Sequence, residues 1–156
     1  MKRKIEVINS NLKFKVNKKN IADAAEKILR AEGAQLYSLS ILVCEDTYIQ
    51  NMHKIYFDDD SPTDVISFPM DKFEKDNPEG GYLGDLLISA DRAFKVAKDF
   101  DNTLQKEFFL YVVHGILHLL GYDDIAEADR LIMREKEKKI LKSFSFRNKQ
   151  EIIYEL

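Results

Sequence analysis

The spacing of apolar positions along the chain predicts short strands interspersed with helices. Apolar residues that alternate with polar ones, or that form short buried runs, predict strands at 5–8, 12–16, 39–44, 63–68 and 84–89. Apolar residues at helical spacing predict helices over about 18–32, 48–56, 90–100, 103–120 and 126–143. The first two strands flank a turn at 9–11, and 58–62 is expected to be a loop. The stretch 69–81 is the longest irregular segment and a candidate mobile flap, and the tail to Leu156 is expected to be frayed.

Residues that begin and end helices support these boundaries. Asp46 or Thr47 can begin one helix and Ser89 or Asp91 another, because their side-chain oxygens accept from the free amides of a first turn. Gly121 can end the helix that starts near 103, since glycine adopts the left-handed conformation without a Cβ penalty. Helices and strands alternate along the chain, which predicts a single α+β domain over residues 1–156. We expect a small mixed β-sheet of about four strands, covered by about five helices, with a metal site at the end of a central helix.

Composition places the chain among soluble, single-domain proteins. Hydrophobic residues make up 45% of the 156 residues, which is enough for a core, and no apolar run approaches the ~20 residues that cross a bilayer. The amino terminus, Met1–Val7, is charged and lacks the apolar segment of a secretory signal. Cys44 lies in the apolar run 41–44 and is expected to be a core thiol; as the single cysteine it allows no disulfide within the chain. We expect a cytoplasmic protein with no membrane partner, and the oligomeric state stays open.

The charge of the chain does not show whether it binds nucleic acid. The formal net charge of −3 neither indicates nor excludes nucleic-acid binding, which needs only a local basic patch. Basic residues cluster at Lys13, Lys15, Lys18 and Lys19, and again at Lys136, Lys138, Lys139, Lys142, Arg147 and Lys149. Both clusters mix with acidic residues or lie on expected helices, which favours solvated helix faces.

The stretch His114–Asp124 carries the strongest chemical signal. Its two histidines, His114 and His118, stand four residues apart, so on a helix they lie about 40° apart on one face and can reach one divalent cation. A sharp turn at Gly121 can bring Asp124 back toward them. The spacing matches the His-x-x-x-His-x-x-Gly-x-x-His pattern of one class of zinc hydrolases. Here Asp stands in the third place, and Gly115 replaces the glutamate of those enzymes.

A metal site competes with a simpler explanation, since one histidine in so apolar a helix is usually a hydrogen-bonded core residue. Two histidines at this spacing, followed by glycine and a carboxylate, favour the metal site. Three protein ligands leave a coordination position open for water or substrate, as in catalytic sites. A bound divalent ion lowers the pKa of its water to about 7, which indicates hydrolysis, with zinc as the expected ion. A peptidase of this kind lacks its general base here, because position 115 is glycine.

Three blocks of the chain resemble the YbeY family of bacterial ribosomal RNA maturation endoribonucleases. These blocks are His114–Asp123, Pro62–Phe68 and Gly84–Ile88, and they span roughly the middle half of the chain in the order of the family. The resemblance implies a single α+β domain that binds one zinc-like ion through three histidines. It also implies a role in small-subunit ribosomal RNA 3′-end maturation and ribosome quality control. Ribosomal RNA and the small ribosomal subunit are expected partners on this ground alone.

The resemblance also implies which residues bind the metal ion. His114 and His118 match the first two ligands and are the expected catalytic residues, and Asp124 stands where the family usually has its third histidine. A carboxylate can bind zinc, although it weakens the ion as a Lewis acid and can favour manganese or magnesium. Asp123, one residue away, can replace Asp124 or orient a ligand.

Three further residues are candidates for the cleft. Ser67 and Asp85 lie in the matching blocks and are expected to line it, although hydrogen bonding at the sheet end explains them equally well. Tyr111 shares the histidine face of its helix and is expected beside the ligands.

The chain departs from the family at one more position. The family typically carries an arginine upstream of residues 63–64 that acts on the RNA phosphate, and Phe57 occupies that position here. Lys54, Lys72 or Arg92 can replace it only if the fold brings one of them to the cleft. His53 lies in the same helix, either at the surface or in the cleft.

Three functions are compatible with these patterns. The working hypothesis is a metal-dependent endoribonuclease in ribosomal RNA maturation, with His114, His118 and Asp124 as ligands. The missing arginine favours the second, a non-catalytic ribosome assembly factor with a structural metal. The third is a zinc hydrolase of another substrate, which requires a general base that the sequence does not locate.

Overall fold

The computed structural model describes residues 4–61, 63–144 and 151–156. Pro62, at the end of the expected loop, and Arg147 and Lys149 of the second basic cluster lie outside the described residues. The strands are β1 (Ile5–Asn9), β2 (Phe14–Val16), β3 (Tyr37–Cys44), β4 (Val65–Pro69), β5 (Gly81–Ser89) and β6 (Ile153–Glu155). The helices are α1 (Lys18–Ala31), α2 (Asp46–Phe57), α3 (Ala90–Asp99), α4 (Leu104–Leu119) and α5 (Glu127–Lys142).

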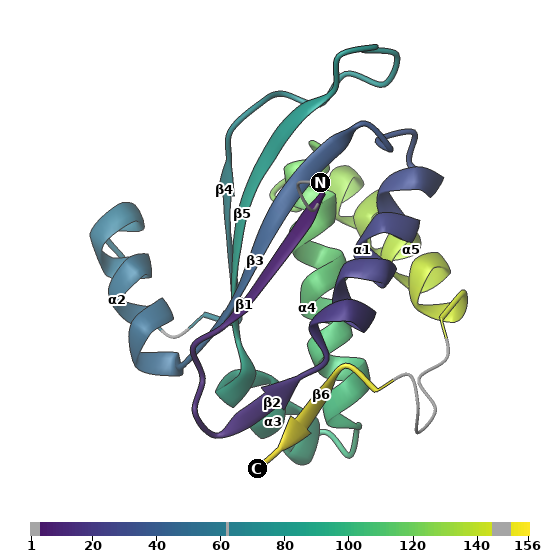
Figure 1. Cartoon of the computed structure of the whole chain (residues 1–156). Helices are drawn as coiled ribbons and strands as arrows, with labels where there is room; N and C mark the ends of the chain where they lie inside the picture. The colour runs from purple at the N-terminus through teal and green to yellow at the C-terminus, as the bar shows by residue number, and fades with distance from the viewer. Residues whose placement is uncertain (1–3, 62, 145–150) are drawn as a thin grey trace.

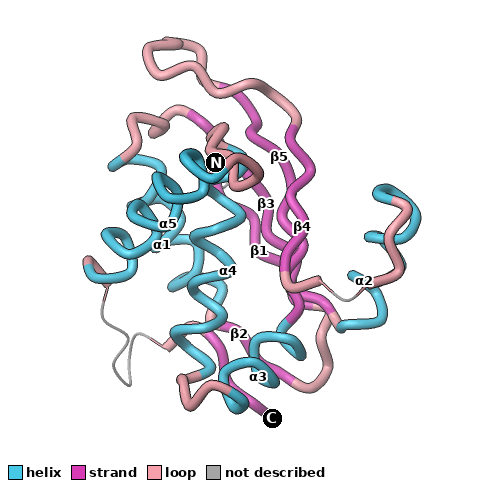
Figure 2. Tube along the Cα trace, turned by 180° about the vertical axis from the view of Figure 1, so that it is seen from behind, coloured by secondary structure: helices cyan, strands magenta, loops and turns pink. Residues whose placement is uncertain are grey.

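The predicted class, an α+β domain with a mixed four-stranded sheet and five helices, is confirmed. The strands of the sheet lie in the order β1-β3-β5-β4, parallel except for β4. Helices α1 and α4 lie against one face of this sheet, and α5 packs against α4 (Figure 1). Seen from behind, α2 lies on the opposite side of the sheet from α1, α4 and α5, next to β4 and β5 (Figure 2).

Period-two alternation divides β3 and β5 between the two faces of the sheet. Ile41, Val43 and Ile88 are buried in the core cluster beneath α1 and α4. The alternate positions Ser40 and Asp85 instead line a cavity beside α2. Burying a side chain such as Ile or Val contributes about 1.5–3 kcal/mol, so the face covered by α1 and α4 is the stable centre of the fold.

Helix α4 lies unusually close to the sheet at Gly115. A Cβ atom at this position would lie 2.9 Å from the side chain of Leu86 and 3.2 Å from that of Val65. The hydroxyl of Ser67 donates a hydrogen bond to the carbonyl of Gly115 at 3.4 Å, which joins β4 to the helix backbone. The missing side chain therefore sets the position of α4 on β4 and β5.

The predicted end of α4 at Gly121 is confirmed. Gly121 has a φ of +101°, in the region that favours glycine. Its amide donates to the carbonyl of His118 at 3.0 Å, and the amide of Tyr122 donates to that of Leu117 at 3.0 Å. These two bonds form a Schellman motif, which satisfies the last carbonyls of the helix and turns the chain back.

The predicted cap of α3 is confirmed and that of α2 is wrong. Ser89 accepts from the amide of Arg92 at 3.0 Å and so begins α3. Neither Asp46 nor Thr47 caps α2; the carboxylate of Asp91, from α3, accepts from the amide of Asp46 at 2.8 Å. The two helices begin side by side, so one carboxylate can serve the neighbouring helix, which local spacing does not reveal.

The expectation of a frayed tail is also wrong for residues 151–156, whereas residues 145–150 lie outside the described part of the chain. Strand β6 pairs antiparallel with β2, so the strands expected around the turn at 9–11 belong to two different sheets. Ile152 and Ile153 are fully buried, and the side-chain carbonyl of Gln105 accepts from their amides at 2.8 Å and 3.3 Å. Two apolar residues are too few to show a periodicity, so only the tertiary fold reveals this strand.

The segment predicted to be irregular is shorter than expected. Strand β5 begins at Gly81, and amides beyond the end of β4 still pair with it, those of Met70 and Asp71 donating to the carbonyls of Leu83 and Tyr82. The mobility of the remaining loop stays a prediction.

Two expectations from composition concern Cys44 and membranes. Cys44 is fully buried, and burial raises the pKa of its thiol to about 12, as expected for a core residue rather than a nucleophile. No helix in the described part of the chain is long and apolar enough to cross a membrane.

Replacing Ile153 by alanine tests whether the carboxyl-terminal strand is part of the fold. The substitution is expected to lower the free energy of unfolding by about 2–5 kcal/mol, because it removes a buried side chain. Leu156→Ala is the matched control: this residue is 77% exposed, and little change is expected. Denaturant unfolding of both variants measures the difference, and equal stabilities would contradict the packing of β6.

Candidate metal site

Three side chains at the end of α4 converge on one point. The Nε2 atoms of His114 and His118 lie 3.1 Å apart, and Oδ2 of Asp124 lies 3.5 Å from the first and 3.3 Å from the second. A tetrahedral ion with bonds of ~2.0 Å separates its ligand atoms by about 3.3 Å. The triangle of donor atoms therefore has the size that zinc requires.

The other ring nitrogens orient the two histidines. Nδ1 of His118 lies 3.1 Å from the carbonyl of Tyr122, and Nδ1 of His114 lies 3.4 Å from a carboxylate oxygen of Glu137. Both partners can only accept, so each Nδ1 carries the proton and each Nε2 presents a lone pair to the common point. Two lone pairs and a carboxylate oxygen repel one another at these distances unless a cation lies between them. The donor set thus fits a divalent ion and argues against two ordinary core histidines.

The loop after Gly121 delivers Asp124 to the histidines. The carboxylate of Asp123 accepts from the amides of Asp124 and Ile125 at 2.7 Å and 3.1 Å. This bonding holds a tight turn, so Asp123 shapes the backbone while its neighbour faces the rings. Of the two aspartates that the sequence offers, the structure brings Asp124 to the histidines and leaves Asp123 exposed beside them.

Tyr122 ties the same loop to two other helices. Its hydroxyl donates to the carboxylate of Glu32, at the end of α1, at 2.7 Å. Lys136 of α5 reaches the same carboxylate at 3.2 Å. Burial, together with the bond to Glu32, raises the pKa of the Tyr122 hydroxyl, which therefore stays protonated as a donor at neutral pH.

The three converging side chains open into a cavity of about 530 Å³. Its walls are the end of α4, the residues His53 and Phe57 of α2, and the chain from Thr63 to Ser67 with Pro69. No lysine or arginine is among the described residues that line it. Lys54 pairs instead with Asp60 at 3.5 Å.

The other two candidates to replace the missing arginine also lie elsewhere. Arg92 pairs with Asp46 at 3.2 Å, near the start of α2, and Lys72 is an exposed residue of the loop after β4. Neither lines the cavity.

His53 lines this cavity, a position that the sequence left undecided between cleft and surface. Its Nδ1 lies 3.1 Å from the carbonyl of Ser61, and its Nε2 lies 3.9 Å from the carboxylate of Asp59. Because the carbonyl can only accept, Nδ1 of His53 donates this hydrogen bond. His53 and Phe57 stand four residues apart on α2, so they share one face of the helix and line the same wall.

Two of the residues expected in the cleft lie elsewhere. Ser67 lines the cavity, but Asp85 does not. The register pairs Phe68 with Asp85 and Ser67 with Leu86, so Asp85 shares the opposite face of the sheet with Phe68. Tyr111 is also absent from the cavity: it is buried in the core, and burial raises the pKa of its hydroxyl.

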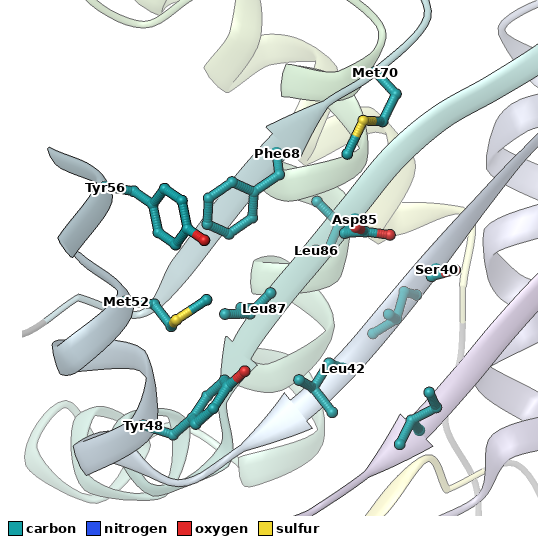
Figure 3. Close-up of a pocket in the computed structure, with 12 residues that line it drawn as sticks. Ser40, Leu42, Tyr48, Met52, Tyr56, Phe68, Met70, Asp85, Leu86 and Leu87 are labelled. Carbon is teal, nitrogen blue, oxygen red and sulfur yellow. The ribbon is translucent and has the colours of Figure 1, made fainter.

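Asp85 belongs to a second cavity, of about 490 Å³, between α2 and the sheet (Figure 3). Tyr48, Met52 and Tyr56 of α2 line one side of this largely apolar cavity. The hydroxyl of Tyr82 hydrogen-bonds to the Asp85 carboxylate, which gives this acid a partner within the sheet.

The sequence of the chain is similar to that of a known protein family. The sequence model of a family described as Endoribonuclease YbeY matches residues 6–145. A protein of Fusobacterium nucleatum named Endoribonuclease YbeY is 44% identical over 110 residues, which are 69% of this chain and 67% of that protein. One of the same name from Finegoldia magna is 34% identical over 151 residues, 94% of this chain and 97% of the relative.

A solved structure shares the fold. The solution structure of a protein from Thermotoga maritima matches with a TM-score of 0.62 and 24% identity, covering 88% of this chain and 87% of that one. At that identity the likeness concerns the fold alone. The family match and the identities to curated relatives go further: the chain belongs to the YbeY family of endoribonucleases.

Proposed function

We propose that this protein is a metal-dependent endoribonuclease that acts in small-subunit ribosomal RNA 3′-end maturation and in ribosome quality control. The observation that carries the proposal is the convergence of His114, His118 and Asp124 at the mouth of a cavity. The names of the relatives support an RNA substrate. Ribosomal RNA and the small ribosomal subunit are the proposed partners, which would place the protein in the cytoplasm.

The donor set supports one divalent ion held by Nε2 of His114, Nε2 of His118 and Oδ2 of Asp124, with zinc as the expected ion. Such an ion lowers the pKa of a bound water and offsets negative charge on a phosphoryl oxygen. All three ligands come from one stretch of eleven residues and approach from the α4 side. The side toward β4 and α2 is then left for the substrate.

The chain itself offers little positive charge to a phosphodiester. The titratable side chains of the described lining are two carboxylates, Asp64 and Asp124, and three histidines. A phosphate in this cavity would therefore depend on the ion for its electrostatic attraction. This is the physical consequence of the phenylalanine at position 57.

The lack of lysine and arginine in the described lining also favours a second candidate function, that of a non-catalytic assembly factor with a structural metal. Without a guanidinium in the described lining, the bidentate contact to a phosphate is absent. A hydrolase of peptides is less favoured. Gly115, the position of the glutamate base in the zinc peptidases of this pattern, packs against Leu86 and has no room for a side chain.

Incubation with precursor ribosomal RNA separates the two candidates. The zinc-loaded protein is expected to cleave this RNA, and a chelator or the substitution His114→Ala is expected to abolish cleavage, because each removes the ion. The assay is read on denaturing gels beside a thermal melt, which checks that the variant is folded. Cleavage that survives His114→Ala would indicate a contaminating nuclease, and no cleavage by the zinc-loaded wild type would favour the assembly factor.

Replacing Asp124 by histidine restores the third ligand that the family usually carries. The substitution exchanges a hard carboxylate for a neutral imidazole, so the preference for zinc over manganese is expected to rise. Competition with a chelating dye for each metal measures the two dissociation constants. An unchanged ratio of the two constants would argue that Asp124 does not touch the ion.

The substitution Gly121→Val tests how Asp124 reaches the ion. Nothing lies within 4 Å of a Cβ built at Gly121, so the cost comes from its φ of +101° alone. A loss of about 1–2 kcal/mol in stability is expected, together with weaker metal binding, because the loop to Asp124 must shift.

Gly33 is the matched control for that experiment. It ends α1 with a φ of +76° and the same two backbone bonds, from Gly33 to Arg30 and from Ala34 to Leu29. Gly33→Val is expected to cost at least as much stability, because its Cβ would also lie 3.1 Å from the side chain of Lys75, and to weaken metal binding less than Gly121→Val does, because Gly33 is not part of the turn to Asp124. Equal metal affinity in both variants would remove the role assigned to the turn at Gly121.

A further inference from the structure

We propose that Glu137 of α5, held in place by Arg134, is a positioning residue that fixes His114 as an Nε2 ligand of the ion. This inference rests on the metal site of the proposed function and adds a residue that lies outside the sequence motif. Glu137 does not line the cavity, so it acts through the imidazole and not on the substrate.

The burial of Glu137 calls for a physical reason. Its side chain is 3% exposed, and it is the one buried charged residue in the described part of the chain. It lies between Met133 and Ile140 on the buried stripe of α5, where an apolar residue would be expected. Removing a carboxylate from water costs several kcal/mol unless the charge is paired and hydrogen-bonded.

Two partners compensate that burial. Nη1 of Arg134 lies 2.7 Å and 3.1 Å from the two carboxylate oxygens of Glu137. The oxygen nearer to the guanidinium also lies 3.4 Å from Nδ1 of His114. Arg134 is 52% exposed, so its guanidinium reaches the buried acid from the surface and holds it at the ring.

The contact to His114 has a chemical consequence. A carboxylate behind an imidazole accepts a hydrogen bond from Nδ1–H, which leaves Nε2 free as the ligand and makes it a better electron donor. The partner ring differs, because Nδ1 of His118 donates to the neutral carbonyl of Tyr122. The two histidines are thus unequal ligands, and the stronger donor is set by an acid 23 residues away in the chain.

A purely structural role for Glu137, as the partner of Arg134 within α5, makes a different prediction. In that case its removal would change stability and leave the metal and the ring unaffected. Metal affinity and the state of the His114 ring therefore separate the two roles.

The substitution Glu137→Gln keeps the size of the side chain and removes its charge. The dissociation constant for zinc, measured by competition with a chelating dye, is expected to rise by about 10–100-fold. Glu135→Gln is the matched control, because Glu135 lies on the same helix, is 77% exposed and pairs with Lys138 at the surface. Its dissociation constant is expected to equal that of the wild type.

Long-range ¹H–¹⁵N spectra of the zinc-loaded protein give a readout that needs no variant. In the wild type, both rings are expected to bind through Nε2, with the Nδ1 proton of His114 further downfield because it faces a carboxylate. In Glu137→Gln this proton is expected to move upfield while that of His118 stays. Binding of His114 through Nδ1 in the wild type would overturn the inference even if the variant failed to fold.

The outcomes also separate the inference from the proposed function. A wild-type protein that binds no zinc overturns the metal site and the inference together. A wild type that binds zinc, with a folded Glu137→Gln whose dissociation constant lies within about twofold of it, overturns the inference alone. Whether the protein cleaves RNA does not enter this test.

Discussion

The close approach of α4 to the sheet at Gly115 is the constraint on which the rest of the structure depends. With no side chain at this position, the helix rests on Leu86 and Val65, and Ser67 bonds to its backbone. The ring of His114, one residue earlier, is thereby held beside β4, which forms one wall of the metal cavity. A larger residue would push the helix outward and separate the ligands from the surface that completes the cavity. The glycine that takes the place of a catalytic glutamate thus has a packing reason to be there.

The parts of the fold and site that sequence can predict are those specified within a short stretch. Helix periodicity identifies α4, and the three candidate ligands lie in one stretch of eleven residues, 114–124, whose turn contains a glycine at positive φ. Which face a residue occupies is harder to predict. Asp85 shares its matching block with core residues, but the register of β4 and β5 turns it to the other side of the sheet. Tyr111, one turn before His114, faces the core because α4 is buried around most of its circumference. Strand β6 and Glu137 depend on packing between distant segments, which no local pattern encodes.

The site combines features of its family with charges of its own. Two carboxylates lie close to the ligand atoms in the described part of the chain: Asp124 contacts both histidines, and Glu137 contacts His114 and is paired with the guanidinium of Arg134. The cavity beyond adds Asp64 but, in its described lining, no lysine or arginine. Such surroundings attract a divalent cation and repel a bare phosphate, so ion and substrate are electrostatically linked. Phe57 and Asp124, in place of the arginine and the histidine that the resemblance implies at these positions, act in the same direction, because both make the cavity more negative.

The anchoring of Tyr122 links metal binding to the stability of the folded protein. The turn that carries Asp124 is tied to Glu32 of α1 and, through it, to Lys136 of α5, while the carboxylate behind His114 also comes from α5. The docking of α1 and α5 therefore holds both the turn before Asp124 and the ring of His114 in the positions that bring the three ligand atoms together. A ligand that binds only the folded state stabilises it by about 2.7 kcal/mol when its free concentration is a hundred times its dissociation constant. Supply of the metal would then regulate how much of the folded protein survives proteolysis, as well as how much of it is active.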